Sequence, residues 1–112
     1  MRNKLAWLLL CLLLLTLLIA ACSNRSFHSS GLEKDFPVPS QAKLVDNGKS
    51  SESYTLTSLK EEEGLPEYYR AEIEDKGWKE VDRMGGKYVF AKDGRKLNLV
   101  IVTEKFELEK VQ

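Results

Sequence analysis

Hydrophobic positions are distributed very unevenly along this chain. Residues 5–19 carry no charged side chain, and only Cys11 and Thr16 interrupt their apolar run. Beyond residue 35 the apolar residues recur instead at the spacings of strands and of one helix. The pattern therefore divides the chain into an apolar leader, a polar connection and one folded domain.

Two short strands are predicted at the start of the domain. Residues 36–39 (Phe-Pro-Val-Pro) are expected to be extended, because proline disfavours helix in the residue before it. Residues 42–46 form the first strand candidate, and the turn pair Asn47-Gly48 ends it. Residues 53–57 alternate polar and apolar side chains, which predicts a second, half-buried strand.

The clearest helical pattern covers residues 66–76. Pro66 suits the first helical position because its fixed backbone angle matches a helix. Apolar residues recur at helical spacing on one face; they are Leu65, Tyr69 and Ile73. Gly77 suits a left-handed C-terminal cap, after which Trp78 can fold back onto the helix end.

Three further strands are predicted after the helix, over residues 78–83, 87–92 and 96–103. Asp93-Gly94 is a hairpin signal between the last two. Residues 104–112 are charged, and we expect them to fray or to form a last helical turn. The order strand-strand-helix-strand-strand-strand predicts an α+β domain, in which one helix packs on one face of an antiparallel sheet of four to five strands.

Composition limits the classes of function. The chain has 112 residues, 30% of them charged, and a formal net charge of zero. This length allows one domain. A neutral chain lacks the basic face of a nucleic-acid-binding protein, so we expect no nucleic acid as partner. Two cysteines are too few for a disulfide scaffold or a four-thiolate metal site.

The first 22 residues have the order of a secretory signal peptide: a positive start at Arg2 and Lys4, an apolar run, and small residues. The segment Ile19-Ala20-Ala21-Cys22 resembles the lipobox of bacterial lipoprotein precursors, which is an aliphatic residue, two small residues and a cysteine. The resemblance implies cleavage between Ala21 and Cys22, and a diacylglycerol joined to Cys22 by a thioether. That acyl lipid is the only covalent group expected, and no other cofactor is predicted.

This resemblance sets the expected domain boundaries and location. Residues 1–21 would be removed, residues 22–35 would form a flexible serine-rich tether from the lipidated Cys22, and residues 36–112 would form the single domain. The mature chain keeps 91 residues with 15 basic and 17 acidic side chains, a net charge of −2. It would be anchored in the cell membrane or outer membrane and face away from the cytoplasm. An uncleaved membrane helix and an unlipidated secreted protein are the alternatives.

Recognised catalytic motifs are absent from the mature sequence, and we expect no enzyme. His28 is the only histidine, and it lies in the expected tether without a catalytic partner nearby. Ser58 and Glu61 have the spacing of a capping box, which predicts a helical turn there. Glu61-Glu62-Glu63 would then form a solvated face rather than a metal site, with weak cation binding as the alternative.

Aromatic residues supply the candidate binding surface. Core packing explains most aromatics at helix and strand spacing. The functional alternative is a platform for a partner, and the candidate contacts are Tyr68, Tyr69, Arg70 and Trp78. If one tyrosine of the pair faces the core, the other points partly outward and is the best candidate.

A second, weaker resemblance covers residues 36–102. The segments that carry it are Pro37-Val38-Pro39, Ala42–Val45, Tyr68-Tyr69, Gly77-Trp78 and Phe90–Lys92. They are similar to small, functionally uncharacterised bacterial envelope domains that pair a proline-rich entrance with a helix ending in Gly-Trp. The resemblance bears on the fold more than on an activity.

These observations predict a non-enzymatic envelope lipoprotein. Its partners would be the membrane, through the lipid, and another envelope protein, and we expect the chain itself to be a monomer. A module that binds cell-wall polymer or a small ligand is the first alternative. An enzyme with an unrecognised carboxylate pair is the second.

Overall fold

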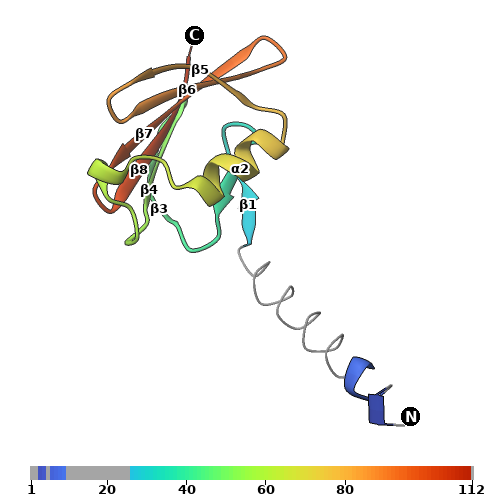
Figure 1. Cartoon of the computed structure of the whole chain (residues 1–112). Coiled ribbons are helices and arrows are strands. Elements are labelled where there is room, and N and C mark those ends of the chain that lie inside the picture. Colours follow the sequence, from blue (N-terminus) through green and yellow to red (C-terminus); the bar gives the residue numbers. More distant parts are fainter. Residues whose placement is uncertain (1–2, 5, 10–25, 112) are drawn as a thin grey trace.

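The computed structural model describes residues 3–4, 6–9 and 26–111 (Figure 1). The lipobox, with Ala21 and Cys22, therefore lies outside the described residues. Residues 3–4 and 6–9 are helical. Within the described parts of the chain, no helix is both long enough and apolar enough to cross a membrane.

Residues 26–111 form two antiparallel sheets, one α-helix and one 3-10 turn. In chain order the elements are β1 (Phe27–Ser29), β2 (Pro37–Pro39), β3 (Lys43–Asn47), β4 (Ser51–Thr55), η1 (Glu61–Glu63), α2 (Glu67–Asp75), β5 (Lys79–Met84), β6 (Lys87–Lys92), β7 (Arg95–Val102) and β8 (Lys105–Lys110). The main sheet has six strands in the order β3-β4-β8-β7-β6-β5, and β1 pairs only with β2. Helix α2 and the β1–β2 ribbon lie on one side of the main sheet (Figure 1).

The predicted α+β architecture agrees with this arrangement in outline, but the predicted strand count was wrong. The main sheet has six strands rather than four or five, and the β1–β2 pair is additional. The largest error concerns the C-terminus, because Lys105–Lys110 is strand β8, between β4 and β7. Phe106 and Leu108 are buried and alternate with charged residues, so this segment has the two-residue period of a half-buried strand.

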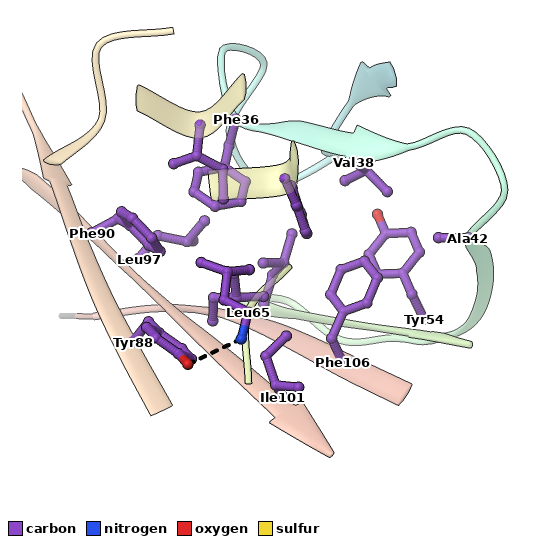
Figure 2. Packing of buried hydrophobic residues seen from close by; sticks show 14 of the residues in the cluster. Phe36, Val38, Ala42, Tyr54, Leu65, Tyr88, Phe90, Leu97, Ile101 and Phe106 are labelled. Carbon is purple, nitrogen blue, oxygen red and sulfur yellow. Dashed lines mark hydrogen bonds between the residues drawn. The ribbon is translucent and has the colours of Figure 1, made fainter. Parts of the chain in front are cut away.

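We call α2 and the β1–β2 ribbon together the helix layer. One core fills the space between this layer and the main sheet (Figure 2). Tyr69 and Trp78 are fully buried, and the Phe36 ring meets both, with centroids 6.5 and 5.4 Å away. Two buried tyrosine hydroxyls are hydrogen-bonded. Tyr69 donates to the Pro37 carbonyl over 2.9 Å, and Tyr88 accepts from the Leu65 amide over 3.0 Å.

Helix α2 ends as its sequence predicts. Gly77 has a φ of +92°, its amide donates to the Glu74 carbonyl, and the Trp78 amide donates back to the Ile73 carbonyl. This pair of bonds is a Schellman cap, which turns Trp78 into the core. The predicted capping box at Ser58 was wrong. η1 begins after Lys60 without a side-chain cap, and the Glu61 amide donates instead to Thr103 Oγ1 over 3.3 Å.

We expect Gly77→Val to lower the free energy of unfolding by more than about 1 kcal/mol, because a β-branched residue resists a positive φ. A Cβ at this position would also approach Lys92 Cε to 3.1 Å. Urea unfolding measures the change. Gly48→Ala is the control, since its backbone needs no positive φ. An unchanged midpoint for Gly77→Val would contradict the strained cap.

Candidate functional site

The segment predicted as a flexible tether is largely part of the fold, which corrects the expected boundary at residue 36. Phe27 pairs with Pro39 across the β1–β2 ribbon. Its ring lies 6.3 and 6.2 Å from the rings of Tyr68 and Tyr69. The expectation failed because local polarity indicates a loop, whereas the contacts that fix this segment come from residues distant in sequence.

A buried carboxylate holds the next part of this segment. Glu52 is 6% exposed and lies on the core side of β4. Its Oε1 accepts hydrogen bonds from Ser30 Oγ over 2.7 Å and from the Gly31 amide over 3.0 Å. Burial, and then the neighbouring Glu52 charge, raise the pKa of Tyr54. These bonds fix residues 30–31 against the main sheet.

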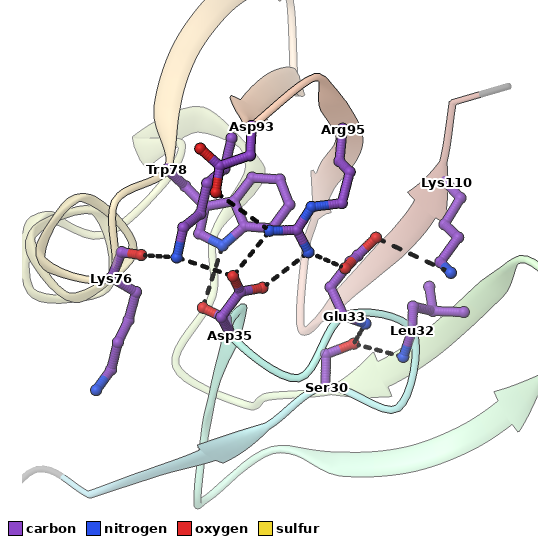
Figure 3. Close-up of polar contacts among 10 residues, drawn as sticks. Ser30, Leu32, Glu33, Asp35, Lys76, Trp78, Asp93, Arg95 and Lys110 are labelled. Carbon is purple, nitrogen blue, oxygen red and sulfur yellow. Dashed lines mark hydrogen bonds and ion pairs between the residues drawn. The ribbon is translucent and has the colours of Figure 1, made fainter.

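An ion-pair network holds the rest of the segment (Figure 3). The Arg95 guanidinium lies over the Trp78 ring, 5.2 Å from its centroid, and pairs with Glu33 and with both carboxylate oxygens of Asp35. Lys92 Nζ lies 2.8 Å from Asp35 Oδ2, and Trp78 Nε1 donates to the Asp35 carbonyl over 3.1 Å. We call the contacts of residues 30–35 with Glu52, Lys92 and Arg95 the N-terminal latch.

The N-terminal latch makes stability depend on pH. Hydrogen bonding from Arg95, together with Lys92 nearby, lowers the pKa of Asp35 from 3.8 to about 2. A carboxylate whose pKa falls on folding stabilises the fold above its unfolded pKa, and that contribution is lost as pH falls through the folded pKa. The stabilisation by Asp35 should therefore disappear between pH values near 3.8 and 2.

We expect Asp35→Asn to lower the free energy of unfolding at pH 7 by about 1 kcal/mol, since solvent screens this partly exposed pair. The difference from wild type should shrink as the pH falls from 4 towards 2. Denaturant melts across that range measure it. A constant difference at every pH would show that the Asp35 charge is not what holds the segment.

An open pocket of about 490 Å³ lies beside the latch, with Phe27, His28, Lys34, Glu72 and Lys76 in its wall. His28 is exposed there. No group of histidine, cysteine, aspartate and glutamate side chains that could hold a metal ion occurs among residues 26–111 or the other described positions.

The structure corrects two of the four candidate partner contacts. Tyr69 and Trp78 are 0% exposed, so both side chains pack in the core and cannot contact a partner. Tyr68 is half-buried beside Phe27. Arg70 pairs with Glu80 over 2.7 Å and lies 5.6 Å from the centroid of the Tyr88 ring. Tyr68 and Arg70 thus remain at the surface of α2. Both already contact residues of the same chain, Tyr68 through Phe27 and Arg70 through Glu80 and Tyr88.

The structure shows another candidate contact surface, on the face of the main sheet opposite α2. We call the side of the main sheet that faces away from α2 the open face. Strand pairing places its residues in rows across the sheet. Its members on the three strands β5, β6 and β7 include Met84, Val89, Ala91, Val100 and Val102. Met84 is 76% exposed and Val102 38% exposed, so this half offers apolar surface to a partner.

Charged residues lie between these apolar side chains on β5, β6 and β7 and continue along the open face on β8 and β3, and they take part in none of the ion pairs of the described chain. They are Lys43, Lys79, Lys87, Lys96, Lys105, Asp46, Asp82, Glu107 and Glu109. Glu107 has only a long 3.5 Å contact from Ser53 Oγ. On the latch side, by contrast, Glu33, Asp35, Lys92, Arg95 and Lys110 all take part in ion pairs. The open face therefore carries charges of both signs, without ion-pair partners among the described residues, interspersed with apolar side chains.

Asn98 lies in the middle of the open face and is 8% exposed. Its side-chain oxygen is buried and has no hydrogen-bond partner among the described residues. Buried polar groups without a partner are rare in folded proteins, because each loses its hydration without compensation. Nothing in the sequence of residues 96–103 indicates this feature, because the apolar pattern of that segment predicts only a strand.

No protein-family model, no curated protein and no solved structure matches this chain.

Proposed function

We propose that this protein is a lipid-anchored, non-enzymatic lipoprotein of the cell envelope that binds a protein partner through the open face of its sheet. The anchor is the lipid that the Ile19-Ala20-Ala21-Cys22 motif implies at Cys22. The observation that carries the binding role is the open face, where exposed apolar side chains lie among charges that form no ion pair with the described residues.

The fold supports a defined orientation for such an anchored domain. Four residues lie between Cys22 and Phe27, so the Cα atoms of these two residues are at most about 18 Å apart when the chain is fully extended. Because the β1–β2 ribbon lies beside α2 and the N-terminal latch joins residues 30–35 to the main sheet, the lipid would hold the helix layer close to the bilayer. The open face belongs to the opposite side of the main sheet and stays accessible to a partner.

A module for cell-wall polymer or a small ligand is the alternative, and the pocket beside His28 and Lys34 is its best support. That pocket is open and has charges of both signs, whereas ligand sites are usually enclosed and mostly apolar. The open face therefore supports protein binding better than the pocket supports ligand binding.

Site-specific photocrosslinking in intact cells tests the proposal. A photoreactive residue at Val102 on the open face should give one dominant protein adduct. The same residue at Glu74, exposed on α2, should give little of that adduct. Equal adducts from both positions, or none from Val102, would contradict a binding role for the open face.

A further inference from the structure

The pocket beside the N-terminal latch lies on the side of the molecule that a partner of the open face would leave free. Its volume of about 490 Å³ is within the range of roughly 300–1,000 Å³ that small-molecule sites occupy. Its lining comes from β1, from the loop at residues 34–35 with Pro37, and from the C-terminal end of α2. Because β1 and α2 belong to the helix layer, the pocket is on the side of the main sheet away from the open face (Figure 1).

Charged side chains of opposite sign reach this pocket from different elements. His28 on β1 and Lys34 in the loop are exposed, and Lys34 takes part in none of the ion pairs of the described chain. Glu72 comes from the last turn of α2, and its 3.8 Å contact with Lys76 is an exposed pair of a kind that stabilises little. The pocket thus offers donors to an anion and an acceptor to a cation.

The second carboxylate of the lining is already paired. Asp35 Oδ2 lies 3.0 Å from Arg95 Nη2 and 2.8 Å from Lys92 Nζ (Figure 3). Glu72 is therefore the carboxylate that can accept hydrogen bonds from a ligand. The two lysines of the lining balance its two carboxylates, so the pocket suits a zwitterion better than a strong anion or cation.

We propose that this pocket binds the phosphoethanolamine headgroup of a bilayer lipid. The proposal rests on the proposed function, because the lipid on Cys22 brings the pocket to the membrane. The Cα atom of Phe27, in the lining, is at most about 18 Å from that of Cys22. The headgroup layer is itself roughly 5–8 Å deep on each side of the bilayer. A bilayer at the mouth also closes the pocket, whose openness disfavours a soluble ligand.

Each part of the headgroup has a matching group in the lining. The Lys34 ammonium and the His28 ring N–H donate to the phosphate, and the Glu72 carboxylate accepts from the primary ammonium, which has three N–H donors. A quaternary ammonium such as choline has no donor and is recognised by cages of aromatic rings. Phe27 is the only Phe, Tyr or Trp among the described residues that line the pocket, so the lining favours ethanolamine over choline.

Photocrosslinking to lipid tests the proposal. The protein isolated from membranes, with a photoreactive residue in place of Ser29 in the lining, is reconstituted into vesicles of equal parts phosphatidylethanolamine and phosphatidylcholine. Mass spectrometry then identifies the attached lipid. We expect an adduct with phosphatidylethanolamine in at least fivefold excess at position 29. A photoreactive residue in place of Ser26, exposed and outside the lining, should give nearly equal adducts. Equal adducts at position 29, or none, would overturn the proposal.

Two matched pairs of variants test the assigned contacts. Glu72→Gln should abolish the preference for phosphatidylethanolamine at position 29, whereas Glu74→Gln, exposed on the same helix but outside the lining, should keep it. Lys34→Gln should lower the adducts with both lipids severalfold, because both carry the phosphate. Lys49→Gln, at an exposed lysine between β3 and β4, should leave them unchanged. Equal effects within either pair would overturn this binding mode.

Soluble glycerophosphoethanolamine distinguishes the two sources of this headgroup chemistry. At millimolar concentration it should leave the lipid adduct at position 29 intact, because the anchor keeps lipid headgroups at a much higher effective concentration. Loss of the adduct would overturn the bilayer as the source. A protein that carries lipid on Cys22 but gives no adduct at position 29 would overturn the headgroup site alone. A Cys22 without lipid would overturn the anchor and the headgroup site together.

Discussion

A chain that begins at Phe36 should be less stable than one that begins at Ser26 by about 3 kcal/mol or more, because the N-terminal segment contributes both aromatic packing and hydrogen bonds. Truncation removes Phe27 from the rings of Tyr68 and Tyr69. It also removes the Ser30 hydroxyl and the Gly31 amide from Glu52, and both carboxylates from Arg95.

Urea unfolding of purified domains that start at Ser23, Ser26 and Phe36 measures this difference. The first two should unfold at the same midpoint, since Ser26 immediately precedes β1. Equal stability of all three would show that residues 27–35 are a dispensable tether, as their polarity alone suggests.

Trp78→Ala should lower the free energy of unfolding by about 3–5 kcal/mol, the range for removing a large buried aromatic side chain. Trp78 is 0% exposed, meets the Phe36 ring edge-on, and supports the Arg95 guanidinium on its face. Its indole nitrogen also holds the Asp35 carbonyl. The substitution thus opens the core and loosens the N-terminal latch together.

Two further variants separate these contributions. Trp78→Phe keeps an aromatic ring but loses the indole hydrogen bond, which contributes about 1 kcal/mol. Tyr68→Ala, at the half-buried neighbour, should lower the free energy of unfolding by under about 2 kcal/mol because less apolar surface is lost. If Trp78→Ala destabilised the domain no more than Tyr68→Ala does, the core role of Trp78 would be wrong.

Local sequence signals predicted the elements that local chemistry determines. The apolar face of α2, its end at Gly77 and the turn at Asp93-Gly94 follow from helical spacing and from glycine in the left-handed region, and the structure confirms them. Strand β8 carried the same kind of signal in Phe106 and Leu108, but the high charge of its neighbours obscured it.

Features that depend on distant pairs could not be predicted in this way. Arg95 lies 60 residues from Asp35, and Ser30 lies 22 residues from Glu52. Only the strand order brings these partners together, because β8 inserts between β4 and β7. The open face also depends on that order, since Glu107 becomes a neighbour of Val100 through the same insertion.

We propose that a lipid on Cys22 holds this domain at a membrane. Mass spectrometry of the N-terminal peptide of the protein isolated from membranes tests it most directly. We expect a peptide that begins at Cys22 and carries a thioether-linked diacylglycerol. A peptide that begins at Met1, or a Cys22 with an unmodified thiol, would contradict it.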